Sequence, residues 1–453
     1  MLQETLNNLK SQPAFNQSER IHKLKKLRRT IRRWQPRIIE ALHADFSHRA
    51  EPETYLAEIM MCLEEINHCI QNIPAWMRVD EAFSGWKFFP SKTAVSPQPL
   101  GVVGIMSPWN YPFNLAIAPL IIAITAGNRA MLKPSEVTEH TSALIKEMLA
   151  EVFSNDEVVV CLGGVDVAIS FSELKFDHLL FTGSTQVGRQ IMQKASQNLV
   201  PVTLELGGKS PVLIGPDYSL RKAARAIVAG KYFNAGQTCI APDYILIDQA
   251  RMNALANEIH KEIERQYPDF VHNKDYSSII NQQHYLRLSE LLEDVTDEQL
   301  SHNPENSKPE NRRFQPLVVK NIKPDQKLMQ DEIFGPILPL MSVESMQHGI
   351  DYICQHPRPL TLYVFSNKSS LIREIREKTH SGSLCVNETL VQFAQKNLPF
   401  GGVGDSGMGR YHGYSGFIAM SHMKSVYYQS RLNFNHVARA PFTKLKRKIL
   451  SWL

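Results

Sequence analysis

A cysteine and a glutamate, 34 residues apart, are the side chains of this 453-residue chain best suited to do chemistry together. Cys239 ends the run Phe-Asn-Ala-Gly-Gln-Thr-Cys, and Glu205 lies upstream in Leu-Glu-Leu-Gly-Gly-Lys. A thiolate is a nucleophile, and a carboxylate can activate a thiol or a water molecule. Each residue also has an ordinary interpretation, since free cysteines are usually buried and acids are common on surfaces. The surrounding elements have to decide between these interpretations.

The elements that would position these residues alternate along the chain. Apolar runs typical of buried parallel strands occur at 100–106, 130–132, 158–162 and 178–181, with helical patterns between them. The alternation begins again after Lys209. The pattern predicts a doubly wound α/β domain followed by a second α/β domain.

The N-terminal segment 18–72 is predicted to be mostly helical, with an interruption or restart at Pro36. One face of its first helix is rich in lysine and arginine. A nucleic-acid-binding arm is one interpretation. A solvated helix face is favoured, because no interleaved aromatic residues accompany the basic ones. We therefore expect no nucleic-acid partner.

Composition narrows the class of protein further. The hydrophobic content is 43%, the charged content 21% and the net charge +5, all ordinary for a soluble globular protein. No apolar run is long enough to span a bilayer, and the N-terminus lacks the pattern of a signal peptide. The six cysteines are scattered, without the spacing of a zinc site. We expect a cytoplasmic protein with reduced thiols and no metal.

Polar residues follow three of the predicted strands. Asn110 lies in Pro-Trp-Asn-Tyr-Pro. Lys133 and Glu136 are the first and last residues of Lys-Pro-Ser-Glu, and Gly183-Ser184 begins the run that ends at Gly188. These could be an oxyanion donor, a ribose site and an anion site at a helix start. Taken singly, each is better explained by a turn or a helix cap.

Taken jointly, six motifs in order resemble the aldehyde dehydrogenase superfamily. They are Pro-Trp-Asn-Tyr-Pro, Lys-Pro-Ser-Glu, Phe-Thr-Gly-Ser-Thr, Leu-Glu-Leu-Gly-Gly-Lys, Gly-Gln-Thr-Cys and Glu-Ile-Phe-Gly-Pro. The spacing of 50 residues from Lys133 to Gly183, the short N-terminus and the glycine-rich run ending in Gly-Arg-Tyr-His-Gly are similar to the class 3 branch. Within it, Val-Asn-Glu-Thr at 386–389 and Arg-Ala-Pro-Phe at 439–442 are most similar to coniferyl aldehyde dehydrogenases.

The resemblance implies a catalytic set and a cofactor. Cys239 would be the nucleophile, Glu205 the base for the hydrolytic water and Asn110 the oxyanion donor. The cofactor would be NAD, with NADP as the alternative. The residues implied to bind it are Ser107, Pro108, Trp109, Lys133, Ser135, Glu136, Gly183, Ser184, Gly188, Leu206, Glu332 and Phe334.

The substrate and the partners are further expectations. An apolar tunnel is predicted at Tyr111, Leu115, Phe393 and Phe400, which favours an aliphatic or aromatic aldehyde. The alternatives are a medium- or long-chain fatty aldehyde, transfer of the thioester to coenzyme A, which Glu205 argues against, and a non-catalytic scaffold. The resemblance also implies a homodimer.

The domain bounds implied by the resemblance follow the motifs. A Rossmann-like NAD(P)-binding domain would comprise 1–85 and 100–206, a catalytic domain 207–392, and a bridging, oligomerising part 86–99 and 393–435. The tail 436–453 is basic and amphipathic. It is too short to span a membrane, so contact with a membrane surface is the alternative to a helix that packs on protein.

Overall fold

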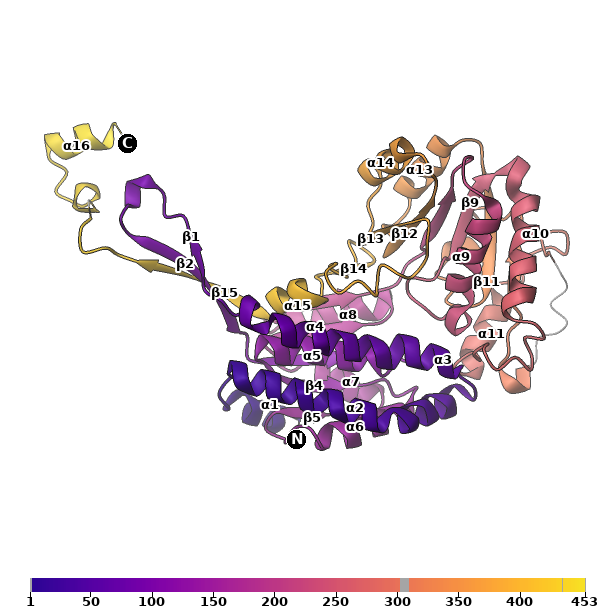
Figure 1. The fold of residues 1–453 in the computed structure, drawn as a ribbon, viewed down its shortest axis with the longest axis horizontal. Helices are drawn as coiled ribbons and strands as arrows, with labels where there is room; N and C mark the ends of the chain where they lie inside the picture. The colour runs from indigo at the N-terminus through magenta and orange to yellow at the C-terminus, as the bar shows by residue number, and fades with distance from the viewer. Residues whose placement is uncertain (1, 302–308, 434, 453) are drawn as a thin grey trace.

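Two six-stranded sheets form the body of the molecule, and a narrow three-stranded arm projects from it (Figure 1). The computed structural model describes residues 2–301, 309–433 and 435–452. The remaining positions fall inside the predicted domain ranges but outside the described residues. The α/β fold with two doubly wound sheets confirms the fold class predicted from the strand and helix pattern.

The first sheet has the strand order β14-β7-β6-β3-β4-β5, and all neighbours are parallel except β14 and β7. Its strands are β3 (Val102–Met106), β4 (Arg129–Lys133), β5 (Val158–Val160), β6 (His178–Thr182), β7 (Val202–Glu205) and β14 (Gly407–Met408). The chain proceeds outward from β3 in one direction and from β6 in the other. The carboxyl ends of β3 and β6 therefore flank a topological switch point, where open α/β sheets bind their ligands.

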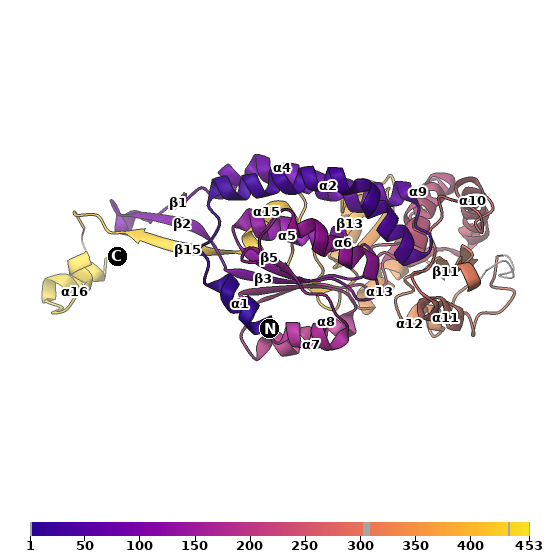
Figure 2. The same ribbon diagram turned by 90° about the horizontal axis from the view of Figure 1, so that it is seen from below.

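Helices cover both faces of this sheet (Figure 2). One face carries α2 (Gln17–Phe46), α4 (Met61–Trp76), α5 (Asn114–Ala126) and α6 (Glu139–Ala150). The other carries α1 (Leu2–Lys10), α7 (Val165–Ser172) and α8 (Thr185–Ser196). Between α2 and α4 lie the short helix α3 (Glu51–Thr54) and the π-helix η1 (Tyr55–Met60).

The predicted interruption at Pro36 is wrong, because α2 runs unbroken through that residue. Asn16 and Glu19 form a capping box at its start. Pro36 is exposed, while Trp34 and Ile38 on either side of it are buried against the core. The packing of the apolar face holds the helix together despite the backbone hydrogen bond that proline removes.

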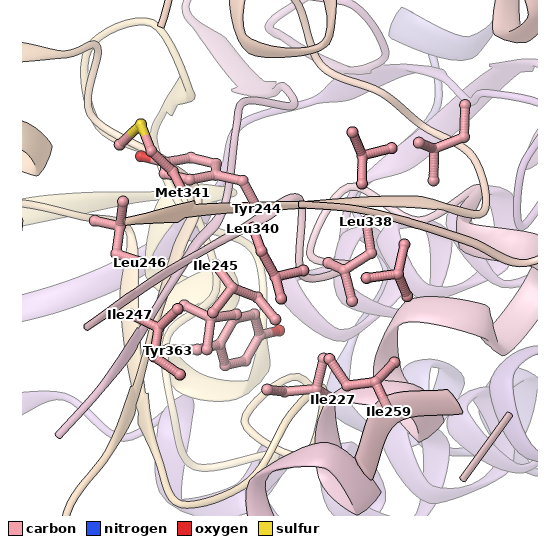
Figure 3. Packing of buried hydrophobic residues seen from close by; sticks show 14 of the residues in the cluster. Ile227, Tyr244, Ile245, Leu246, Ile247, Ile259, Leu338, Leu340, Met341 and Tyr363 are labelled. Atoms are coloured by element: carbon pink, nitrogen blue, oxygen red, sulfur yellow. The ribbon is translucent and has the colours of Figure 1, made fainter. Parts of the chain in front are cut away.

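The second sheet has the order β10-β11-β9-β8-β12-β13 and is parallel throughout. Its strands are β8 (Pro211–Ile214), β9 (Tyr244–Asp248), β10 (Leu317–Val319), β11 (Ile337–Val343), β12 (Thr361–Phe365) and β13 (Ser383–Val386). Its helices are α9 (Leu220–Tyr232), α10 (Gln249–Gln266), α11 (Gln282–Glu290), α12 (Lys327–Gln330), α13 (Met346–Gln355) and α14 (Ser369–Lys378). Figure 3 shows its core, where Ile227 and Ile259 from α9 and α10 pack under the strands.

The arm consists of β1 (Asp80–Ala82), β2 (Lys92–Pro99) and β15 (Ser421–Tyr428), all antiparallel. The short elements η2 (Trp86–Phe88), η6 (Asn435–Ala438) and α16 (Lys444–Leu450) lie along it, while α15 (Gly413–Ala419) packs on the body against α4 and α5. In both views α16 lies at the far end of the arm, away from the body (Figures 1 and 2). Within the described ranges, no helix combines the length and the hydropathy needed to cross a membrane.

Candidate active site

A cavity of about 210 Å³ brings together most of the residues that the sequence singled out. Pro108 follows β3, Gly183 follows β6 and Glu205 ends β7, so the cavity lies at the carboxyl edge of the first sheet. Its lining consists of Pro108, Trp109, Asn110, Leu115, Thr182, Gly183, Ser184, Glu205, Leu206, Gly207, Cys239, His284, Arg287, Glu332 and Phe334. The position is the one expected for a ligand site at a topological switch point.

The backbone before Cys239 forms a left-handed turn. The short helix η3 (Phe233–Gly236) has Asn234 at φ 51° and Ala235 at φ 50°. Gly236 follows at φ 77°, and a Cβ at this position would lie 2.3 Å from the Gly335 carbonyl oxygen. A non-glycine residue in this conformation costs about 1–2 kcal/mol. Two such residues in succession need support from their surroundings.

Cys239 itself is half-buried and faces the cavity. Burial, together with the nearby charges of Glu332 and Glu205, raises the pKa of its thiol. A thiol with a raised pKa is protonated at neutral pH. It therefore needs a base before it can act as a nucleophile.

Glu205 lines the same cavity as Cys239. It is 2% exposed, and neither carboxylate oxygen has a hydrogen-bond partner among the described residues. Burial raises the pKa of this carboxyl well above its ordinary value. A glutamate that is buried without a charge partner, in a cavity shared with a cysteine, has the environment typical of a catalytic acid or base.

Asn110 lies across the same cavity wall. Its Nδ2 donates to the Gln237 carbonyl oxygen at 3.2 Å, next to the Cys239 turn. Tyr111, the following residue, is buried, and its hydroxyl is 2.6 Å from Thr238 Oγ1. Asn110 and Tyr111, in the loop after β3, therefore both hydrogen-bond to the segment that precedes Cys239. Tyr111 does not line the described cavity.

The start of α8 borders the cavity. Ser184 caps the helix, because its side chain accepts from Val187 N. The hydroxyls of Ser107 and Thr182 are buried without a hydrogen-bond partner among the described residues. Free donors beside a helix N-terminus suit a phosphate group. Gly188 lies within α8 and outside the cavity lining.

The role of Gly188 is packing of the helix against the sheet. A Cβ at Gly188 would lie 2.6 Å from Leu206 Cδ2. Leu206 in turn lines the cavity. The glycine thus lets α8 approach the segment after β7 closely.

Glu332 and Phe334 close the cavity from the second half of the chain. A Cβ at Gly207 would lie 2.1 Å from Glu332 Oε2, so the carboxylate rests directly on the glycine backbone. Burial, reinforced by the charge of Asp243, raises the pKa of Glu332 to about 8. The ring of Phe334 lies edge-on to Trp109, with centroids 5.3 Å apart.

Lys133 ends β4, Ser135 and Glu136 follow it, and all three lie outside this cavity. Lys133 is buried, and its Nζ lies 2.9 Å from Glu136 Oε2. Partial burial opposes ionisation of Glu136, but the hydrogen bonds from Lys133 and from its own backbone hold its pKa below the ordinary value. Ser135 Oγ accepts from Val137 N. The ion pair with Lys133 thus fixes the Glu136 carboxylate just beyond the carboxyl end of β4.

Only one of the four residues predicted to form the substrate tunnel lines the cavity. Leu115 lines the cavity. Phe393 and Phe400 instead form an aromatic group with His412, with the Phe400 and His412 rings stacked at 5.2 Å. This group packs into the same core against which Cys239 lies.

Four lining residues were missed by the sequence analysis. Thr182 and Gly207 stand inside motifs already quoted, so attention to their strand ends could have found them. His284 and Arg287 lie three residues apart on α11, and no motif marks them. The His284 ring lies 4.6 Å from Trp109. Arg287 donates to the Ile333 carbonyl oxygen at 2.6 Å.

Comparisons with known proteins show the family of the chain. The sequence profile of the aldehyde dehydrogenase family matches residues 3–426. A probable coniferyl aldehyde dehydrogenase of Pseudomonas aeruginosa is 42% identical over 97% of this chain and 92% of its own length. Aldehyde dehydrogenase family 3 member A2 of Rattus norvegicus is 38% identical over 93% of this chain and 86% of its own. The resemblance inferred from the motifs is thereby confirmed.

Solved structures show the same architecture. The substrate-bound state of Staphylococcus aureus AldH aligns with a TM-score of 0.95 at 36% identity, over 100% of this chain and 99% of that one. A Mycobacterium tuberculosis aldehyde dehydrogenase complexed with NAD+ aligns with a TM-score of 0.84 at 23% identity, over 95% and 90% of the two chains. At that identity the second alignment is evidence for the fold alone.

Proposed function

The chain belongs to the aldehyde dehydrogenase family and is an enzyme that acts on aldehydes, and we propose that it oxidises an apolar aldehyde to the acid through a covalent bond to Cys239. One observation carries the proposal. Cys239, Glu205 and Asn110 line one cavity, and the carboxylate of Glu205 faces it without a partner. A scaffold that had lost catalysis would not need this arrangement.

The residues can perform the chemistry in two stages. Glu205 takes the proton of the Cys239 thiol, and the thiolate adds to the aldehyde carbon to give a thiohemiacetal. Asn110 Nδ2 and the Cys239 backbone N–H would donate to its oxyanion, a contribution of about 3–4 kcal/mol per donor where it has been measured. Glu205 passes the thiol proton to bulk solvent and is ionised again; after oxidation to the thioester it draws a proton from water, whose oxygen attacks the acyl carbon and releases Cys239 as the thiolate.

The described residues fit NAD(P)+, which accepts the hydride of the substrate carbon when it is bound. The unpartnered Ser107 and Thr182 hydroxyls and the start of α8 suit the pyrophosphate. Glu332, resting on the Gly207 backbone, is placed for a ribose. A second hollow of about 600 Å³ shares Ser184, Gly207, Arg287 and Glu332 with the first and provides further room.

We assign the adenine ribose to Lys133 and Glu136. A carboxylate with a lowered pKa stays ionised and accepts hydrogen bonds from ribose hydroxyls. It also repels a 2′-phosphate, which favours NAD. The buried Lys133 ammonium beside it offsets part of that repulsion, so NADP remains the second cofactor.

The proposed substrate is an apolar aldehyde of the coniferyl type. The cavity wall near Cys239 carries Trp109, Leu115 and Phe334, which are apolar side chains suited to an aromatic or aliphatic chain. Relatives named for coniferyl aldehyde and for 4,4′-diaponeurosporen-aldehyde support this class. A medium- or long-chain fatty aldehyde is the second candidate.

The test is NADH formation by the purified protein with coniferyl aldehyde, benzaldehyde, decanal and succinic semialdehyde. We expect turnover with the first three and little with the charged semialdehyde. Cys239→Ala should lower turnover by about 10⁴-fold or more. Activity that survives this substitution would remove the covalent mechanism, and preference for the semialdehyde would remove the apolar substrate class.

The arm, the tail and the location complete the proposal. We propose that the arm pairs two copies as a homodimer, since Phe83 and Trp86 on it are 90% and 68% exposed. Sedimentation at micromolar concentration would contradict this if only a 51.5 kDa species appeared.

Contact of α16 with a membrane surface is the weaker alternative, and equal vesicle flotation with and without 441–453 would exclude it. The six free thiols support a cytoplasmic location, which cell fractionation can test.

A further inference from the structure

A buried arginine outside the cavity lining contacts the backbone of Asn110, one of the lining residues. Arg49 lies between α2 and α3 and is 2% exposed. Its Nη1 donates to the Asn110 carbonyl oxygen at 2.7 Å, and its Nη2 lies 3.5 Å from Glu58 Oε1. The guanidinium also lies over the Tyr111 ring, 4.8 Å from its centroid. Three contacts therefore fix the direction in which the guanidinium points.

The carbonyl oxygen of Asn110 also links the Asn110 loop to the turn before Cys239. It also accepts from Asn234 Nδ2 at 3.1 Å, and Asn234 belongs to the left-handed turn before Cys239. The Asn234 backbone N–H donates to Glu53 Oε1 at 2.9 Å. The segment 49–58 thus holds the Asn110 loop and the Cys239 turn at once.

This network is costly if its only role is stability. Burying an ion pair removes two charges from water, and apolar residues of similar volume are often as stable or more so. Nε and Nη2 of Arg49 have no hydrogen-bond partner among the described residues. Glu58 lies on the π-helix η1, a helical form that is rare outside functional sites. A role in the geometry of the site accounts for these features.

We propose that Arg49 is a positioning residue that holds the Asn110 loop so that the Asn110 amide points at the oxygen of the reacting aldehyde. Glu58 fixes the arginine, and Glu53 fixes the turn on the other side. The inference rests on the proposed role of Asn110 as oxyanion donor. Because a displacement of about 1 Å at a reacting group can cost about 10²-fold in rate, a support of this kind is reflected in the rate of reaction.

The experiment is a double-mutant cycle between Arg49→Met and Asn110→Ala in the full chain, read as kcat/KM for benzaldehyde with saturating NAD. We expect Arg49→Met to cost about 10- to 100-fold in the native background and less than about twofold when Asn110 is alanine. The KM for NAD should stay within about twofold. Arg49→Lys keeps the charge but loses the planar fork, so a smaller loss with the same dependence on Asn110 is expected.

Two variants guard against effects on folding. Arg20→Met removes another buried arginine, which donates to the Phe15 and Thr125 carbonyl oxygens and not to the site, and it should lower Tm without this dependence. Arg49→Lys serves if Arg49→Met does not fold. Equal losses in both Asn110 backgrounds, or no loss, would overturn the inference. If Asn110→Ala is itself fully active, the proposed oxyanion role fails and the inference with it, whereas dependence on Cys239 would still support the covalent mechanism.

Discussion

Two glutamates end or follow strands of the same sheet and differ in almost everything else. Glu205 ends β7, is buried without a hydrogen-bond partner among the described residues, and has a raised pKa. Glu136 follows β4, is exposed, pairs with Lys133 and has a lowered pKa. Burial of Glu205 favours its protonated form, while the hydrogen bonds to Glu136 favour a permanent charge. The contrast predicts chemistry at one and recognition at the other.

Of the two glutamates, Glu205 should show the larger effect when it is replaced by glutamine. Glutamine keeps the volume of the side chain but removes the base, so turnover should fall by about 10²- to 10⁴-fold. If deacylation is the step most affected, the acyl-enzyme should accumulate. Mass spectrometry of the quenched enzyme should then show the substrate acyl group on Cys239. Turnover within about threefold of the native value, with no adduct, would remove Glu205 from the catalytic set.

The sequence allowed much of this contrast to be predicted. Both glutamates stand in motifs at the ends of predicted strands, and the order of strands and helices was enough to predict where those ends meet. What it could not predict is that Lys133 reaches Glu136, whereas the neighbours of Glu205 leave its carboxylate unpartnered. Those facts depend on side-chain directions, which no local pattern specifies.

The support behind the site was harder still to predict. Arg49 stands outside every motif, and its contact with Asn110 joins residues 61 positions apart. His284 and Arg287 lie on a helix whose pattern indicates only an amphipathic surface element. Such long-range contacts depend on how the two sheets meet. The uninterrupted course of α2 through Pro36 also depends on tertiary packing, which outweighed a local signal.

A smaller effect is expected from Glu136→Gln. Removing the carboxylate should weaken NAD binding and relieve the repulsion of a 2′-phosphate, so the ratio of kcat/KM for NAD to that for NADP should fall by up to about fivefold. An exposed charge contributes about 1 kcal/mol, which sets this ceiling. Glu139→Gln, an exposed glutamate at the start of α6, is the matched control and should leave the ratio unchanged. An unchanged ratio in Glu136→Gln would remove the ribose assignment.

The smallest effect concerns stability, and its sign should differ between the two glutamates. The folded protein holds a proton on Glu205 above the ordinary pKa of 4.5, so this group's contribution to stability is fully present below that value and is lost as pH rises through the raised pKa. Glutamine does not ionise, so Glu205→Gln removes this pH-dependent loss of stability. Its Tm relative to the native enzyme should therefore increase as pH rises above 5, by on the order of 1 °C per kcal/mol of linkage.

Glu136 should show the opposite trend. Its folded pKa lies below 4.5, so its contribution is present above that value and is lost as pH falls through the lowered pKa. Relative to the native enzyme, Glu136→Gln should lose Tm as pH rises from about 3 to 5, by less than about 1 °C because solvent screens an exposed pair. Calorimetry at a fixed scan rate measures both variants. Trends of the same sign would mean that the two carboxylates do not have the opposite environments from which their separate roles are argued.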